Sequence, residues 1–199
     1  MKRAVLICLL ICLSLCGRAF AQQRATVSGT VAAPEGLPET ARIGVHIVDT
    51  QGVWGREIGT TTPENGTFEV ELAGSTDALT PFRSSDVVLP GLQNDYSLSG
   101  DVNFTRAQID VYLDENGNGT FDRETDTPYL GLAGTSDPSG FFVPLYVDAD
   151  TTLEANGQTF ELKRGWNIFT VRFPEGGEPE YNISSTLDAA RLDVFPGEP

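Results

Sequence analysis

The sequence predicts an all-β fold, an antiparallel β-sandwich. Short segments in which apolar and polar residues alternate recur along the chain, and turn-forming residues separate them. No long segment shows the periodicity of an amphipathic helix. An antiparallel sheet with one side in water needs an apolar face opposite a polar face, as these segments provide. Many short strands joined by Gly- and Pro-containing turns are typical of a sandwich or a barrel.

The clearest predicted strand is the segment 68–72, where Phe68, Val70 and Leu72 alternate with two glutamates. Six other segments have the same period of two. Their apolar positions are Val27, Gly29 and Val31; Ile43, Val45 and Ile47; Ala107, Ile109, Val111 and Leu113; Phe141, Val143, Leu145 and Val147; Phe169, Val171 and Phe173, entered through Trp166; and Ala190, Leu192 and Val194.

The N-terminus has the pattern of a secretory signal peptide, which we expect to span residues 1–21. Lys2 and Arg3 precede the apolar run 4–16, and Ala19–Ala21 is a small-x-small cleavage site. The run is shorter than the roughly 20 apolar residues of a membrane-spanning helix, so no transmembrane segment is expected. The pattern predicts a bacterial protein that is secreted, periplasmic or located at the cell surface.

A lipid anchor at Cys16 is the alternative to free secretion. Residues 13–16 resemble a bacterial lipobox, but Leu15 stands where a small residue is usual, so we favour cleavage after Ala21. All three cysteines of the chain lie inside the expected signal. Residues 22–199 therefore contain no thiol, which excludes disulfides, Cys metal sites and thiol nucleophiles there.

The expected mature chain is strongly acidic. Residues 1–21 hold three of the 13 basic residues and none of the 28 acidic ones, so ten basic residues remain and the net formal charge is −18. Such a surface disfavours nucleic acid and anionic lipid as partners. It suits cations and an extracellular setting.

One domain over residues 22–195 is the preferred organisation. The stretch 75–100 is the least regular part, and we interpret it as a crossover within one sandwich rather than a boundary between two smaller domains. Residues 196–199 are expected to form a flexible tail.

Residues 26–72 resemble the carboxypeptidase regulatory-like, or prealbumin-like, β-sandwich family. The resemblance rests on VSGTVAAPEGLPETARIGVHIVDTQG followed by TTPENGTFEVEL: a strand near Gly-x-Val, an alternating strand, and a turn into Gly-x-Phe. It implies an immunoglobulin- or prealbumin-like sandwich and a non-catalytic accessory role. Fold alone does not determine function.

The segment LDENGNGTFDRETD, residues 113–126, has the spacing of a calcium-binding loop. Calcium takes six to eight oxygen ligands, and alternate residues of a curled loop supply them. The candidate ligands are Asp114, Asn116, Asn118, the carbonyl of Thr120, and Asp122. The loop resembles EF-hand-like loops and those of serine-aspartate surface-protein B domains, with Gly119 at the sharp turn. Structural calcium is therefore the expected cofactor.

The loop departs from the family pattern at its closing position, where Thr125 replaces the expected glutamate. Either Glu124 or Asp126 could close the shell, and we favour Asp126 because a loop easily accommodates one extra residue. The alternative is a plain hairpin, since Asn-Gly is a strong turn signal and Leu113 and Phe121 could flank it as strand residues.

His46 and two tryptophans are the other residues considered for function. His46 is the only histidine, and we expect it to be a solvated strand residue. Trp166 is expected to lie in the core. Trp54 is expected to pack at the rim, and it is also a candidate for stacking on a sugar ring.

We therefore expect an exported, non-enzymatic β-sandwich module with a structural or binding role at the cell envelope. Its expected partner is a protein or glycan at the cell surface. A carbohydrate-binding module is the alternative, which requires Trp54 to be exposed beside other aromatic residues. An exported hydrolase is the third interpretation, and it requires paired carboxylates or a serine beside His46.

Overall fold

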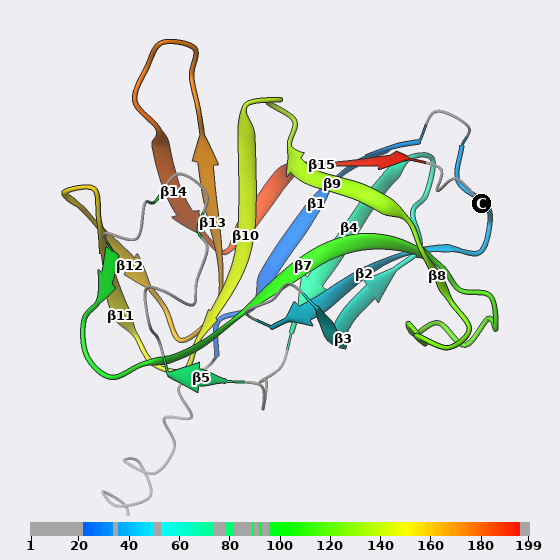
Figure 1. Ribbon diagram of the computed structural model, residues 1–199, viewed down its shortest axis with the longest axis horizontal. Coiled ribbons are helices and arrows are strands. Elements are labelled where there is room, and N and C mark those ends of the chain that lie inside the picture. Colours follow the sequence, from blue (N-terminus) through cyan, green and yellow to red (C-terminus); the bar gives the residue numbers. More distant parts are fainter. Residues whose placement is uncertain are drawn as a thin grey trace, which may run out of the picture.

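The computed structural model describes residues 22–33, 36–49, 53–73, 79–81, 89, 92 and 96–195. Within these residues all regular secondary structure is β-strand, which confirms the all-β prediction (Figure 1). The expected signal peptide 1–21 with Cys16, most of the expected crossover 75–100, and the tail 196–199 lie outside the described residues. No described helix is long and apolar enough to span a membrane.

The strands of the described residues are numbered in chain order. They are β1 (Ala25–Ala32), β2 (Ala41–Val48), β3 (Trp54–Thr61), β4 (Thr67–Leu72), β5 (Thr80–Pro81), β6 (Tyr96–Leu98), β7 (Asn103–Leu113), β8 (Thr127–Pro128), β9 (Leu130–Thr135), β10 (Gly140–Val147), β11 (Thr151–Ala155), β12 (Gln158–Leu162), β13 (Gly165–Arg172), β14 (Glu180–Ser184) and β15 (Thr186–Phe195).

Three sheets are formed from these strands. The largest has the order β14-β13-β10-β7-β2-β3, and β5 and β8 also pair with β7. A four-stranded sheet has the order β4-β1-β15-β9, and a three-stranded sheet the order β12-β11-β6. The three-stranded sheet lies at one end of the long strand β7, and the loop that follows β7 lies at the other end (Figure 1).

One strand pair departs from the predicted antiparallel arrangement. β1 pairs with β15 in parallel, so the first and last strands of the described chain run side by side in the same direction. The two strands approach closely at Gly29, where an added Cβ would lie 1.9 Å from the carbonyl oxygen of Ala190. The absence of a Cβ at Gly29 thus allows this pairing.

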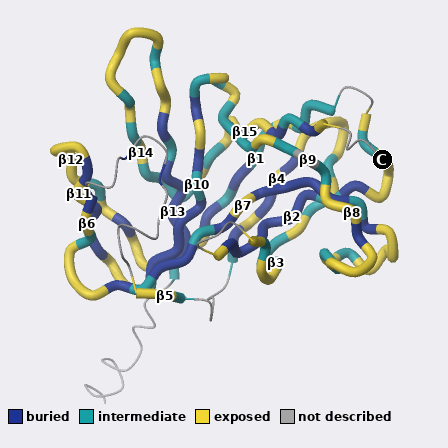
Figure 2. The backbone as a smooth tube through the Cα atoms, in the orientation of Figure 1, coloured by how far each residue is buried: buried dark blue, intermediate teal, exposed yellow. Residues whose placement is uncertain are grey.

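The largest sheet is covered on both faces. On one face, residues of β2, β7, β10 and β13 share a hydrophobic core with β1, β4 and β15 of the four-stranded sheet. On the opposite face, called here the outer face, a second core joins β7, β10 and β13 to the three-stranded sheet. Figure 2 shows the buried residues concentrated in these central strands.

The burial of β10 and β13 differs from the predicted alternation because both faces of these strands are covered. Phe142 and Tyr146 of β10 belong to the first core, while Leu145 and Val147 belong to the second. Phe141, predicted to share the buried face of Leu145, is 44% exposed near the end of the sheet. A buried strand with two apolar faces does not show a simple period of two.

Candidate functional site

The acidic loop from Asp114 to Asp126 connects β7 to β8. Thr127 and Pro128 of β8 pair with Leu113 and Tyr112 of β7, so the loop closes a wide hairpin. The alternative of a plain Asn-Gly hairpin flanked by Leu113 and Phe121 as strand residues is therefore wrong, since Phe121 lies in the loop and not in a strand. Gly117 and Gly119, each preceded by Asn, both have positive φ angles, of 70° and 78°. The two Asn-Gly pairs thus bend the loop back on itself.

Asp114 and Asp126 are the two buried carboxylates of this loop, and both accept main-chain hydrogen bonds. Asp114 accepts from the N–H groups of Asn118 and Gly119 at 3.1 and 2.9 Å. Asp126 accepts from the N–H groups of Glu115 and Asp122 at 3.1 and 2.7 Å. The loop is therefore held from its two ends by carboxylates that cap its own amides.

The charge of Asp114 is stabilised by its surroundings. Burial raises the pKa of its carboxyl, but the Gly119 hydrogen bond and the Arg42 guanidinium outweigh burial, and the pKa lies below its usual value. The Arg42 Nε atom lies 3.3 Å from Oδ2 of Asp114. Asp114 is thus ionised at neutral pH without needing a metal ion to hold its charge.

The remaining predicted ligands lie on the exposed side of the loop. The side-chain oxygen of Asn116 accepts from the Asn118 N–H at 3.0 Å, and that of Asn118 accepts from the Thr120 N–H at 2.8 Å. Glu124 is exposed, and its N–H donates to Asp122 Oδ1 at 3.1 Å. Of the two candidate closing residues, the structure therefore places Asp126 inside the loop and Glu124 outside it.

Among the described residues, no group of three or more His, Cys, Asp or Glu side chains is placed to hold a metal ion. The side-chain oxygens of Asp114, Asn116, Asn118 and Asp126 accept hydrogen bonds from main-chain N–H groups of the loop. They do not converge on one point where an ion would lie. Asn and carbonyl oxygens are also calcium ligands, and carboxylate oxygens keep further lone pairs. Calcium in this loop therefore stays a prediction.

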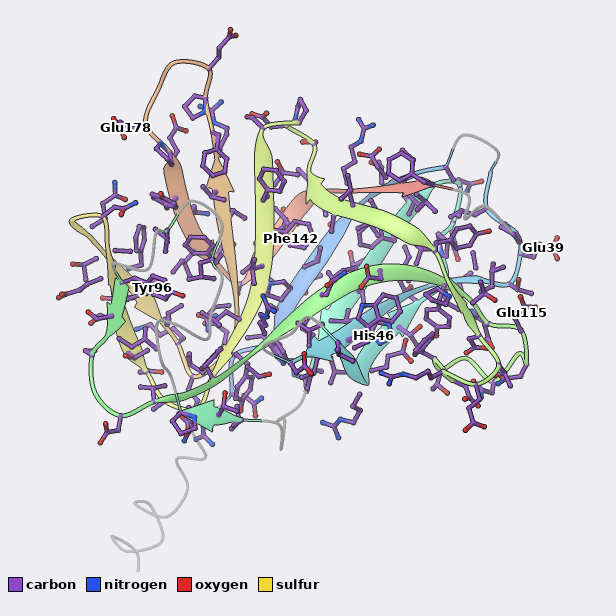
Figure 3. All side chains as sticks on the ribbon, in the orientation of Figure 1. Glu39, His46, Tyr96, Glu115, Phe142 and Glu178 are labelled. Carbon is purple, nitrogen blue, oxygen red and sulfur yellow. The ribbon has the colours of Figure 1, made fainter. Side chains whose placement is uncertain are left out.

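His46 is fully buried on the outer face, so its predicted solvent exposure is wrong. The Trp54 ring stacks on it with centroids 4.4 Å apart and planes at 7°. Phe121, from the acidic loop, packs edge-on against both His46 and Trp54 at 5.1 and 5.2 Å. Tyr112 completes this group, with its ring centroid 6.1 Å from that of His46. Figure 3 labels His46 on the ribbon. We call these four residues the aromatic cap.

Within and next to the aromatic cap lie buried polar atoms without hydrogen-bond partners among the described residues. They are both ring nitrogens of His46, Oε1 of Glu57 and Oδ2 of Asp110. A Cβ added at Gly44 would lie 2.4 Å from His46 Nε2 and 2.7 Å from Glu57 Oε1, so both atoms converge above this glycine. Within the part of the chain that the structure describes, no serine forms a hydrogen bond to a ring nitrogen of His46.

Burial determines the protonation states of His46, Asp110 and Glu57. It lowers the pKa of His46 to about 4 and raises that of Asp110 to about 6. Burial also raises the pKa of Glu57, although the Phe121 N–H donates to its Oε2 atom at 3.0 Å and opposes the shift. At neutral pH His46 is therefore a neutral ring, and its contribution is to packing.

A hollow of about 690 Å³ lies on the outer face beside the aromatic cap. Its floor is formed by three residues that lie side by side across neighbouring strands. Val48 of β2 pairs with Trp54 of β3 on one side and with Arg106 of β7 on the other. The other apolar side chains of the lining are Ile47, Val53, Leu79 and Phe104. The indole of Trp54 is half-buried and forms one wall.

The described lining of the hollow is positively charged, although the protein as a whole is acidic. Arg56, Arg106 and Arg123 line it together with one carboxylate, Asp49. Arg106 Nη2 donates to the main-chain oxygen of Asp49 at 3.1 Å, and Arg123 donates to that of Trp54. These carbonyl acceptors carry no formal charge, so they do not neutralise the two guanidinium groups.

Sequence reasoning selected Trp54 but missed the arginines beside it. The alternation of β7 places Phe104, Arg106, Asp110 and Tyr112 on the same side, which the sequence shows directly. It does not show that Val48 pairs with both Trp54 and Arg106, because a register shift in β3 sets that alignment.

Comparison with models of known protein families, with curated proteins and with solved structures finds no match to this chain. The two resemblances drawn from the sequence therefore stay predictions.

Proposed function

We propose that the protein is a non-catalytic binding module with a β-sandwich fold, and that the hollow beside Trp54 holds its ligand. The hollow itself is the observation that carries this proposal. Its volume of about 690 Å³ falls within the roughly 300–1,000 Å³ of small-molecule sites. A mainly apolar lining with a few convergent polar groups is also typical of such sites.

The packing of the sheets supports the sandwich architecture. Strands β1, β4 and β15 share one core with β2, β7, β10 and β13, as two facing sheets do. The prealbumin-like family suggested by residues 26–72 has this architecture, and export to the cell envelope follows from the proposed signal peptide.

Fluorescence of Trp54 provides the test. Trp166 is 1% exposed in the core, so Trp166→Phe leaves Trp54 as the only indole, and it lies at the hollow. The Nε1 atom of Trp166 is buried without a hydrogen-bond partner, so phenylalanine sacrifices no hydrogen bond. Titration with neutral oligosaccharides, organic acids and amines should change the Trp54 emission for at least one class. If no class changes it, the hollow is not a ligand site.

Carbohydrate is a second candidate ligand, supported by the position of Trp54 at the hollow. Indole rings stack on sugar faces, and part of this side chain remains accessible. Its neighbours in the aromatic cap are packed against one another, however, and do not form an exposed platform. Strong changes with neutral oligosaccharides and none with acids would favour this ligand class.

We further propose that the acidic loop binds calcium and so orders the aromatic cap. Asp114, Asn116, Asn118, Thr120, Asp122 and Asp126 are the proposed ligands. Two residues of the same loop reach the proposed ligand site, since Phe121 packs on Trp54 and Arg123 lines the hollow. Calcium at tenfold its dissociation constant would stabilise the folded state by about 1.4 kcal/mol.

Calcium binding is best measured directly, because Asp114 caps loop amides whether or not an ion is present. Isothermal titration of the mature protein should give one site with a dissociation constant of about 10⁻⁴–10⁻³ M, the range of extracellular modules. Millimolar calcium should also raise the melting temperature. Asp122→Asn, which keeps an oxygen but removes a charge, should weaken binding, and Asp188→Asn on β15 is the matched control. Identical melting curves in calcium and in chelator would contradict the proposal.

A further inference from the structure

We infer that the hollow beside Trp54 is selective for a small molecule with an apolar body and one carboxylate group. This inference rests on the proposed binding function and names the chemical class of its ligand. Three features carry it: guanidinium groups that outnumber the carboxylates of the described lining, an apolar floor between them, and the acidity of the rest of the protein.

The first feature is the state of Arg106 and Arg123. A guanidinium group has five N–H donors, and each of these residues uses one described hydrogen bond to a main-chain oxygen. Within the described residues, neither has an ion pair with a carboxylate. Most other described arginines do have one: Arg24, Arg42, Arg172 and Arg191.

These two guanidinium groups can therefore bind an additional acceptor. Arginine binds a carboxylate through two parallel N–H···O bonds, which are stronger than bonds between neutral groups. Arg56 adds a third positive charge to the lining, and Asp49 removes one. The described lining thus keeps a net formal charge of +2, enough to favour a single anionic group.

The second feature is the apolar floor. Val48 lies between Trp54 and Arg106 in the sheet, so an anion held by Arg106 has apolar surface directly beside it. Val53 is 48% exposed at the hollow, and water covers this surface when no ligand is bound. A ligand with an apolar group next to its carboxylate would remove this surface from water, whereas a fully hydroxylated ligand would gain less.

The third feature is the overall charge. A mature chain with a net formal charge of −18 repels a polyanion at long range, so a polyuronate or a strongly acidic peptide is disfavoured. A monocarboxylate experiences far less repulsion and gains the local attraction of the arginines. The expected ligand is thus small, singly charged and partly apolar.

The test compares matched probes on the Trp166→Phe protein by Trp54 fluorescence. Hydrocinnamate has an apolar ring and a carboxylate, and hydrocinnamamide has the same shape without the charge. We expect the acid to bind about tenfold more tightly than the amide, as one charge-assisted interaction provides. Added sodium chloride should reduce this preference because the arginines are partly accessible to solvent.

Substitutions of single arginines test whether the preference for the acid over the amide arises in the hollow. Arg106→Gln and Arg123→Gln should each reduce acid binding several-fold and leave amide binding nearly unchanged. Arg24→Gln makes the same change of charge at an exposed ion pair with Glu71 and should have no effect. Thermal melts of all three show whether the fold is retained.

The possible outcomes separate this inference from the proposed function. Equal binding of acid and amide would overturn the selectivity while leaving the hollow as a ligand site. Binding of methyl glucuronide without binding of hydrocinnamate would overturn the apolar part and assign the carboxylate to a sugar. Binding of methyl glucoside alone would overturn the whole inference in favour of a neutral sugar. If no probe changes the Trp54 emission, both proposals fail.

Discussion

His46 and Asp110 show how burial dominates the chemistry of single residues in this protein, although Gln108 Nε2 donates to Asp110 Oδ1 at 2.8 Å and opposes the effect of burial on that carboxyl. Both lie on the outer face, and both have buried polar atoms without partners among the described residues. Burial disfavours the charged form of each group, so it lowers the pKa of the imidazole and raises that of the carboxyl. The two residues consequently make opposite contributions to the pH dependence of stability.

The signs follow from proton uptake on unfolding. Below about pH 6.5 the unfolded chain protonates His46 while the folded chain does not until about pH 4, so acid lowers the free energy of unfolding. Asp110 stays protonated in the folded chain up to about pH 6, whereas the unfolded carboxyl ionises near 3.8. The contribution of Asp110 to the free energy of unfolding is therefore present at low pH and is lost as the pH rises toward 6.

We predict that Asp110→Asn stabilises the protein at pH 8 and has little effect at pH 4. Removing a buried charge should raise the free energy of unfolding by up to about 3 kcal/mol, the equivalent of roughly two pKa units. Urea unfolding at the two pH values measures the difference. Asp188→Asn at an exposed position is the control, and it should be near neutral at both. A destabilised Asp110→Asn protein at pH 8 would mean that the carboxylate has a partner in solution besides the Gln108 amide, which donates to its Oδ1 atom at 2.8 Å.

His46→Phe should show the opposite trend. Phenylalanine keeps a ring against Trp54 but cannot take up a proton. Relative to the unsubstituted protein, this variant should gain stability on going from pH 7 to pH 4.5, and Asp110→Asn should lose it. The same urea titrations give both values, and parallel pH profiles for the two variants would contradict the assignment.

At the scale of elements, the acidic loop and the outer face of the sheet depend on each other. Phe121 fills the space between His46, Trp54 and Tyr112, and its N–H donates to Glu57. The loop is thus attached to the sheet by a side chain as well as by β8. Phe121 thus contributes to the covering of His46, together with Trp54, which stacks on the ring.

Phe121→Ala should therefore detach the loop and expose His46. The loss of a partly buried aromatic ring should lower the free energy of unfolding by about 2–3 kcal/mol. The more specific signal is the pKa of His46, which should rise from about 4 toward 6.5 once the aromatic cap opens. The single histidine of the chain makes this titration simple to follow by NMR.

Phe141→Ala is the matched control for this experiment. Phe141 is 44% exposed on β10, far along the sheet from the aromatic cap, so its removal should leave the His46 titration unchanged. An unaltered His46 pKa in Phe121→Ala would show that the sheet buries the histidine without the loop.

Seven of the described strands were predicted from their alternation, but β3, which carries Trp54, and the pairing that creates the hollow were not. Phe68, Val70 and Leu72 are buried in β4 as their alternation predicts. The alternation of β2 likewise puts His46 on the face opposite Ile43 and Val45, and sequence reasoning then assigned that face to solvent. That assignment failed because Trp54 stacks on His46 and Phe121, distant in sequence, packs edge-on against it, and local patterns do not encode such contacts.

The conformation of the acidic loop was also predicted only in part, because it depends on contacts with residues outside the loop. Its sharp turn at Gly119 follows from residue type and spacing, whereas the burial of Asp114 was not predicted. The role of Asp126 as a second internal cap depends on the width of the hairpin, which is set where Thr127 and Pro128 pair with β7. A sequence pattern of ligand positions cannot fix that width.

At the scale of the whole molecule, the parallel pair of β1 and β15 joins the two ends of the described chain. β15 lies between β1 and β9, so it fills a central position in the four-stranded sheet. Three of its residues belong to the first core: Ala190, Leu192 and Val194. The fold therefore cannot be completed until the last strand is available.

A chain that ends at Ser185 should consequently fail to fold. It loses the buried side chains of Leu192 and Val194, each worth roughly 1.5–3 kcal/mol, and it leaves both β1 and β9 without a partner on one side. These losses are comparable with the total stability of about 5–15 kcal/mol of an ordinary domain. Near-ultraviolet circular dichroism and proton NMR should show the loss of fixed side-chain packing.

A chain that ends at Phe195 keeps every described strand and is the control. Because strand addition can restore a sheet in trans, a peptide of residues 186–195 should recover the native spectrum of the shortened chain, and a native spectrum without the peptide would refute the central role of β15.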